Sequence, residues 1–202
     1  MNFQSNLLTN ESNQMSTPET VDVSLEFTPN PNTLKYVVNR VLLEKGAANF
    51  PDVSAAERSP LAKRLFAVTG VSGVMVGKNF VTVTKGSEGD WEGLNRGVTD
   101  IIKDHLTKNL LVLEEGAVTG GPTGQGVGAI EDKIRAILDA EIRPAVAMDG
   151  GDITFERFEN GVVYLYLQGS CSGCPSSTAT LKMGIENRLK EQIPEVQEVV
   201  SV

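Results

Sequence analysis

A glycine-rich segment divides this sequence into two parts. Six of the thirteen residues 116–128 are glycine, and Pro122 stands among them. Such a stretch holds neither a helix nor a strand cheaply, which predicts a flexible linker. No Lys-Ser or Lys-Thr pair follows the glycines, so a phosphate-binding loop is not indicated. We therefore expect the 202 residues to form two small domains that can reorient independently.

The rest of the chain divides accordingly. We expect a disordered lead-in over residues 1–19, a first domain over 20–115, the linker over 116–128 and a second domain over 129–202. The first twenty residues contain no Lys or Arg and no sustained apolar stretch. They match neither the pattern of a secretory signal nor that of a mitochondrial presequence, so we expect a cytoplasmic protein.

Charge and hydropathy argue against two classes of partner. The chain carries 26 acidic and 18 basic side chains, a net charge of −8, and it has no basic stripe. Nucleic-acid binding is therefore not expected. No run of 18 or more apolar residues is present, so we expect no transmembrane helix and no membrane partner.

The first domain mixes strand and helix patterns. Residues 21–27 alternate at period two, which predicts a strand with Val21, Val23, Leu25 and Phe27 on one face. A helix is expected to begin at Asn32 or Thr33, because the apolar residues that follow have helical spacing. The remaining expected elements are a short helix capped by Ser59 with Pro60 in its first turn, a hairpin turning at residues 77–79, and a helix from about 91 to 107.

Two side chains of the first domain invite a chemical interpretation. His105 is the only histidine and lies at the edge of an apolar helical stripe. With no second histidine and no nucleophile context, we interpret it as a packing residue. Trp91 is interpreted in the same way, as a core anchor at the start of a helix rather than a stacking platform.

The second domain has the predicted order α-β-β-α-β. A helix beginning near Ile130 is expected to end at Pro144, and the segment from Asp149 to Asp152 is read as a tight turn. Strands over 153–158 and 162–168 are expected to join at an Asn-Gly turn, followed by a helix over 175–190 and a strand over 196–202. Met183 and Ile185 are interpreted as packing residues. Both domains therefore belong to the α+β class.

The two cysteines of the chain, Cys171 and Cys174, lie between a predicted strand and a predicted helix. Pro175 occupies the first helical position, so free backbone N–H groups and the positive end of the helix dipole favour the thiolate form. Gly169 and Gly173 remove side-chain bulk beside the sulfurs. The pair is therefore expected to be exposed and reactive.

Three uses of this pair compete on the residues alone. Thiol–disulfide exchange needs only two cysteines, but the thioredoxin fold places its CxxC after a strand of a parallel βαβ unit, not after an antiparallel hairpin. A structural zinc site or an iron–sulfur cluster generally needs four ligands. Two chains related by a two-fold axis would supply four thiolates, so either metal site implies a homodimer.

The motifs taken together resemble a known family. The series DGGD, hairpin, GSCSGCPSS and TLKMGIENRLK resembles the C-terminal NifU-type domain of Nfu iron–sulfur cluster carriers. The segments TPNPNTLKYVVN and GVMVGKNFVTVTK resemble the N-terminal domain of Nfu proteins. From these residues we expect neither a mitochondrial presequence nor a cysteine-bearing scaffold domain upstream, and we therefore expect carriage of clusters rather than their assembly.

The resemblance implies a function and a set of ligands. Cys171 and Cys174 would hold a cluster bridged between two subunits, typically [4Fe–4S], with [2Fe–2S] the other type left open. The protein would receive the cluster from an upstream donor and transfer it to apo-proteins, as a carrier rather than an enzyme. The remaining alternatives are a thiol–disulfide oxidoreductase and a zinc-bridged interaction module.

Overall fold

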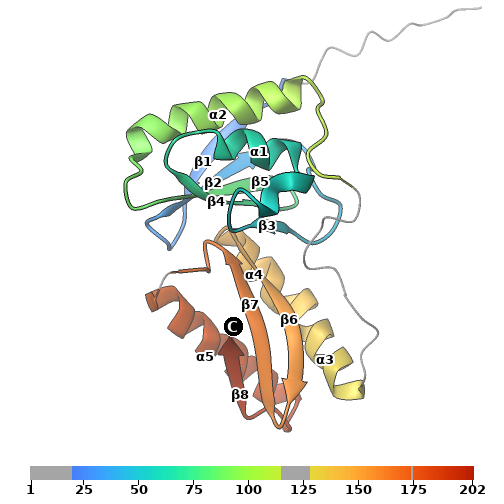
Figure 1. Cartoon of the computed structure of the whole chain (residues 1–202). Helices are drawn as coiled ribbons and strands as arrows, with labels where there is room; N and C mark the ends of the chain where they lie inside the picture. Colours follow the sequence, from blue (N-terminus) through green and yellow to red (C-terminus); the bar gives the residue numbers. More distant parts are fainter. Residues whose placement is uncertain (1–19, 115–127, 174) are drawn as a thin grey trace, which may run out of the picture.

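The computed structural model describes residues 20–114, 128–173 and 175–202, the side chains of residues 175–177 excepted. These residues form two sheets, each with its own helices, which we call the N-terminal unit (residues 20–114) and the C-terminal unit (residues 128–202) (Figure 1). The predicted α+β class is confirmed. The expected lead-in and nearly all of the expected linker lie outside the described residues.

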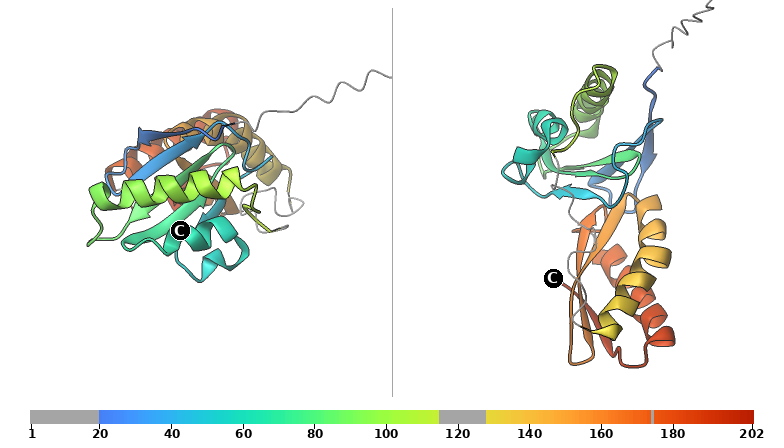
Figure 2. Two further views of the ribbon diagram at one scale, coloured as in Figure 1. Left: turned by 90° about the horizontal axis from the view of Figure 1, so that it is seen from above. Right: turned by 90° about the vertical axis from the view of Figure 1, so that its right-hand side faces the viewer.

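The N-terminal unit is a five-stranded antiparallel sheet in the order β1-β2-β5-β4-β3. Helices α1 and α2 lie on one face of this sheet, and the C-terminal unit meets the other face (Figure 2). Its elements are β1 (Val23–Phe27), β2 (Thr33–Val38), β3 (Ala48–Phe50), η1 (Ala55–Arg58), α1 (Pro60–Phe66), β4 (Val71–Val76), β5 (Phe80–Lys85) and α2 (Trp91–Thr107).

The helix expected after Asn32 is wrong, because this segment is strand β2. The strand pairs with β1 on one side and with β5 on the other. Every residue of β2 except Val37 is buried, including Lys35. A strand covered on both faces shows a continuous apolar run instead of a period-two alternation, and such a run is easily mistaken for a helix.

Other sequence predictions in this unit are confirmed. The side chain of Ser59 accepts a hydrogen bond from the Ala62 N–H and caps α1, with Pro60 in the first turn. Strands β4 and β5 form the expected hairpin, and α2 begins at Trp91 as predicted. Strand β1 also forms, but Phe27 at its end is 86% exposed, because β1 is an edge strand of the sheet.

The C-terminal unit has a three-stranded sheet in the order β6-β7-β8 with helices on one face (Figure 2). Strands β6 and β7 are antiparallel, and β8 adds parallel to β7. The hairpin turns at Asn160 and Gly161, both with positive φ, as the Asn-Gly pair predicts. Its elements are α3 (Ala129–Ile137), η2 (Leu138–Ile142), α4 (Arg143–Met148), β6 (Gly151–Glu159), β7 (Val162–Gly169), α5 (Pro175–Gln192) and β8 (Glu198–Ser201), so the predicted order is confirmed.

Pro144 does not end the first helix of this unit, contrary to the sequence prediction. The chain passes through a π-helical segment, η2, and continues as α4 to Met148. The Arg143 N–H donates to the carbonyl of Leu138, five residues earlier. Proline lacks an N–H, and its ring collides with the carbonyl four residues back in a regular α-helix. The wider π-type turn carries the helix past this position.

The two units are in direct contact. Lys35 Nζ donates a hydrogen bond of 2.9 Å to the carbonyl of Met148, at the end of α4. Ala147 of the same helix packs against a small apolar cluster of the N-terminal unit that contains Met75 and Phe80. A Cβ placed on Gly150 would lie 2.9 Å from Thr82 Cγ2, so the backbones approach closely here. No local sequence pattern indicates this interface.

Candidate functional site

Cys171 lies in the loop between β7 and α5, at the end of the C-terminal unit that faces the N-terminal unit (Figure 1). Its N–H donates to the carbonyl of Gln168 at 3.3 Å, which turns the chain back after β7. The side chain is only 6% exposed and belongs to the apolar core of the C-terminal unit. The expectation of an exposed thiol is therefore wrong for Cys171. Cys174 lies outside the described residues.

Gly151 makes room for the sulfur of Cys171. A Cβ built on Gly151 would overlap Cys171 Sγ, so any larger residue would displace the thiol. The predicted turn covers only Asp149 and Gly150, the latter with φ of +77°, while Gly151 and Asp152 already belong to β6. The sequence DGGD thus combines a turn, which the sequence predicted, with a hollow for the sulfur, which it did not.

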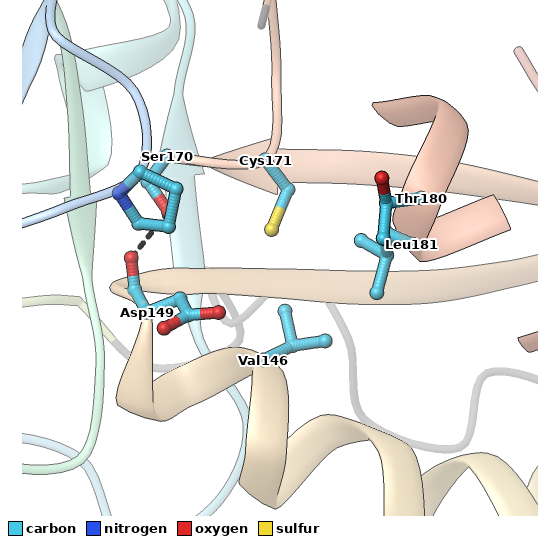
Figure 3. A pocket seen from close by; sticks show the side chains of 7 residues that line it. Val146, Asp149, Ser170, Cys171, Thr180 and Leu181 are labelled. Atoms are coloured by element: carbon cyan, nitrogen blue, oxygen red, sulfur yellow. Dashed lines mark hydrogen bonds between the residues drawn. The ribbon is translucent and has the colours of Figure 1, made fainter. Parts of the chain in front are cut away.

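A cavity of about 450 Å³ adjoins the thiol. Figure 3 shows the sulfur of Cys171 directed toward the space between Asp149, Val146 and Leu181. The hydroxyl of Ser170 donates to the carbonyl of Asp149 at 2.5 Å and ties the Cys171 loop to the turn before β6. The cavity is lined by Pro29, Val146, Asp149, Ser170, Cys171, Thr180 and Leu181, so the N-terminal unit contributes to it through Pro29.

Asn30 of the N-terminal unit binds the backbone on both sides of Cys171. Its Nδ2 donates to the carbonyl of Ser170 at 3.2 Å and to the carbonyl of Ser172 at 3.0 Å. Asn30 is 3% exposed and lies in the loop between β1 and β2. The sequence predicts a break in the chain here, before a helix at Asn32 or Thr33, and no local pattern indicates the contact.

A buried ion pair stands next to Gly151. Arg143 Nε and Nη2 each donate to a different carboxylate oxygen of Asp152, both at 2.8 Å, and Nη1 donates to Asp139 at 2.9 Å. The hydrogen bonds to Asp152 raise the pKa of Arg143 above its usual value, against the opposing effect of burial. The side chain of Asp152 is only 6% exposed. The pair attaches the start of α4 to β6 beside the Cys171 hollow.

Four residues were predicted to be packing residues, and the prediction is confirmed for three of them and wrong for Met183. His105 is fully buried, and its Nε2 lies 3.1 Å from the carbonyl of Leu111. Trp91 packs against the core of the N-terminal unit while its Nε1 donates to the carbonyl of Pro31. Ile185 is buried as expected. Met183 is 65% exposed, so its assignment to packing is wrong.

Two further properties of the described residues bear on the site. Within the ranges that the structure describes, no group of three or more His, Cys, Asp or Glu side chains could hold a metal ion. Among the helices described there, none has both the length and the apolar character needed to cross a membrane.

Comparison with known proteins places both units in one family. Residues 134–200 match the model of the NifU-like domain, and residues 23–109 match that of the scaffold protein Nfu/NifU N-terminal domain. The human protein named NFU1 iron-sulfur cluster scaffold homolog, mitochondrial, is 42% identical over 181 residues, which is 89% of this chain and 71% of the human protein. The chain belongs to the Nfu family.

One further relative and one solved structure are similar to this Nfu chain. The protein of the same name from Drosophila willistoni is 41% identical over 190 residues, 91% of this chain and 64% of that protein. The chain thus spans about two thirds of the length of these relatives. The solution structure of a NifU-like protein from Saccharomyces cerevisiae is 20% identical, with a TM-score of 0.42, and covers 57% of this chain and 99% of that one.

The family matches include the residues described above. Cys171, Cys174, Gly151 and the Arg143–Asp152 pair all lie in the region that matches the NifU-like domain, whereas Asn30 lies in the region that matches the Nfu N-terminal domain. The resemblance stated from the sequence is thereby confirmed for both parts of this Nfu protein.

Proposed function

We propose that this Nfu protein carries an iron–sulfur cluster as cargo, held by Cys171 and Cys174, and delivers it to apo-proteins. The family membership supports this function, since the human and Drosophila relatives are named iron-sulfur cluster scaffold homologs. The position of Cys171 supports this site in particular. Its sulfur lies in the space left by Gly151 and is directed toward a cavity.

The number of thiols determines how many chains are needed to hold the proposed cluster. Clusters of the [4Fe–4S] and [2Fe–2S] types are usually held by four thiolates, and the chain has two cysteines. Two copies of the chain provide four, so we propose one cluster, of the [4Fe–4S] type, per homodimer. A cluster held only by loop cysteines has few surrounding constraints, which suits its release to an acceptor.

Anaerobic reconstitution with iron and sulfide tests this function. We expect a coloured dimer whose iron and sulfide contents equal one [4Fe–4S] cluster per two chains. Cys171→Ser and Cys174→Ser should each abolish uptake, whereas Ser172→Ala, a matched change of an exposed residue between the two cysteines, should leave it intact. A colourless monomer would contradict the proposal.

Two outcomes would point to the other uses of the cysteines. Protein that binds zinc but no sulfide would support a zinc-bridged module. Metal-free monomer that reduces insulin disulfides would support a thiol–disulfide oxidoreductase.

Domain organisation and location are also part of the proposal. We propose that the described units correspond to two domains, over residues 20–115 and 129–202, joined by the glycine-rich linker. Limited proteolysis should cleave first between them. The cytoplasmic location expected from the sequence stays a prediction, and the human and Drosophila relatives are named as mitochondrial.

A further inference from the structure

The backbone around Cys171 is held by side chains at three successive carbonyls. Asn30 Nδ2 donates to the carbonyls of Ser170 and Ser172, at 3.2 and 3.0 Å. The carbonyl of Cys171 itself accepts from Thr178 Oγ1 at 3.5 Å. Two of these three contacts come from the other unit of the molecule. The N-terminal unit therefore adds to the hydrogen bonds from Ser170 and Cys171 that hold this loop within its own unit.

Hydrogen bonds within the N-terminal unit fix the position of Asn30. Its Oδ1 accepts the N–H of Asn32 at 3.0 Å, which directs the amide nitrogen toward the Cys171 loop. Its carbonyl accepts from the N–H of Thr33 and from Thr28 Oγ1, both at 2.9 Å. A buried amide with both ends hydrogen-bonded has one orientation, so Asn30 acts as a rigid clamp rather than a chance contact.

The loop that Asn30 holds has a glycine with positive φ at each end. Gly169 has φ of +62° and Gly173 has φ of +77°, a region that L-residues with side chains rarely adopt. A Cβ on Gly169 would lie 2.7 Å from Met75 Cε of the N-terminal unit, whereas a Cβ on Gly173 would meet open space. These glycines therefore shape the turn at both ends of the loop, with Gly169 closely packed and Gly173 open.

The buried state of Cys171 conflicts with the role proposed for it. Cys171 is 6% exposed with both units in place, so its sulfur cannot in this position also contact a cluster shared with a second chain. Resting on the proposed function, we infer that Asn30 is a positioning residue: its two hydrogen bonds hold the Cys171 loop in a closed position, with the thiol turned inward, and loading requires their release. The N-terminal unit thus controls access to the thiol.

The interface between the units is suited to release. Beside the packing of Ala147 against Met75 and Phe80, it has two polar anchors. These are Asn30 and Lys35, which also pairs with Glu26 at 2.9 Å. Thr82 is 1% exposed beside Gly150, and its hydroxyl has no hydrogen-bond partner among the described residues. Hydration of this hydroxyl on separation offsets part of the cost of breaking the other bonds.

Thiol labelling of the metal-free full-length chain tests the inference. In a Cys174→Ser background, Cys171 is the only thiol, and its reaction with a disulfide reagent such as DTNB reports its exposure. Asn30→Asp removes both donors and places a carboxylate against two carbonyls. We expect labelling about tenfold faster than in the parent, since two hydrogen bonds of ordinary strength are lost. Asn32→Ala, a change of an exposed residue in the same loop, should label at the parent rate.

Hydrogen–deuterium exchange separates positioning from general destabilisation. Exchange should rise in the peptide that covers residues 168–173 and stay unchanged in β4 and in α2, with the same urea midpoint. If Asn30→Asp does not fold, Asn30→Ser, which is too short to reach both carbonyls, takes its place with the same expected result. A folded variant that labels at the parent rate, or one that exchanges faster throughout, would overturn the inference.

Uptake of iron and sulfide by the chain is measured in a separate experiment. With both cysteines present, Asn30→Asp should take up iron and sulfide faster than the unmodified chain. If no form of the protein takes up a cluster, the proposed function fails while the labelling result still stands. If uptake occurs but labelling does not change, the positioning role fails and the proposed function stands.

Discussion

The sulfur of Cys171 occupies the space that a side chain on Gly151 would fill. The two residues come from different segments of the chain and meet where β6 begins and β7 ends, with Gly151 directly opposite Gly169 in the register. Gly151, the second glycine of the DGGD sequence, and Cys171, the first cysteine of the CxxC loop, therefore act as one structural element.

Gly151→Ala should displace Cys171 from its hollow. The added methyl group overlaps the sulfur, so the loop must shift, and overpacking of a core of this kind costs about 1–3 kcal/mol. Urea denaturation should show this loss of unfolding free energy. Gly184→Ala is the matched control, because a Cβ there meets no neighbour and alanine favours the helix. Equal stability of the two variants would contradict the overlap.

Asp152→Asn should destabilise the C-terminal unit. Removing the carboxylate leaves the largely buried Arg143 guanidinium without its main partner, and breaking a buried ion pair costs about 3–5 kcal/mol. Thermal or urea unfolding followed by circular dichroism measures the loss. Glu141→Gln, which breaks the exposed pair with Arg188, is the control and should change the midpoint much less. A reversed order of the two effects would show that the buried pair is not a structural anchor.

The pKa of His105 should lie below its ordinary value. Burial lowers it most, and the Arg64 charge adds to this effect, while the Leu111 carbonyl opposes it. As the chain has one histidine, NMR titration of its ring signal gives this pKa without an assignment step, and we expect a midpoint below 6.5. A midpoint at or above that value would contradict the prediction.

The same shift gives the N-terminal unit a pH-dependent stability. The unfolded chain takes up the histidine proton first as the pH falls, so the unfolding free energy is complete above pH 6.5 and decreases below it. Urea denaturation followed by the fluorescence of Trp91, the only tryptophan, reports on this unit. His105→Gln should remove this part of the dependence on pH.

Ser59→Ala should loosen α1. Ser59 is fully buried, caps the helix through Ala62 N–H, and donates its own proton to the carbonyl of Val112 at 2.7 Å. The loss of a cap together with a buried carbonyl left unpaired costs about 2 kcal/mol. Denaturation followed by Trp91 fluorescence measures it, with the exposed Ser87→Ala as the control. If the loss of unfolding free energy equals that of a helix cap alone, the hydrogen bond from Ser59 to the Val112 carbonyl contributes little to stability.

Local patterns predicted those elements whose signals lie within a few residues. The Ser-Pro start of α1, the Asn-Gly turn after β6 and the amphipathic stretch of α2 each carry their own evidence, and each is found. The predictions were wrong for two segments whose environment is formed by distant parts of the chain. Strand β2 is buried between two layers, and the helix at Pro144 continues through a π-type turn stabilised by its surroundings.

The candidate site shows the same division. The sequence motifs pointed to Cys171 and to the DGGD turn, and the two meet as one element. The burial of Cys171, the Arg143–Asp152 pair and the contact from Asn30 depend on packing between segments as far as 142 residues apart, which no local pattern contains.

The two ends of the β6–β7 hairpin are built from different residues. At one end a tight Asn-Gly turn closes it, and at the other the last rung of the ladder consists of two glycines, Gly151 and Gly169, with no side chains to pack across the strands. Glycine in a strand has the most backbone freedom to regain and the least to lose in contacts. This end of the hairpin is therefore held by groups outside the strand pair, namely Asn30 and the Arg143–Asp152 pair, and not by side chains packed across its last rung.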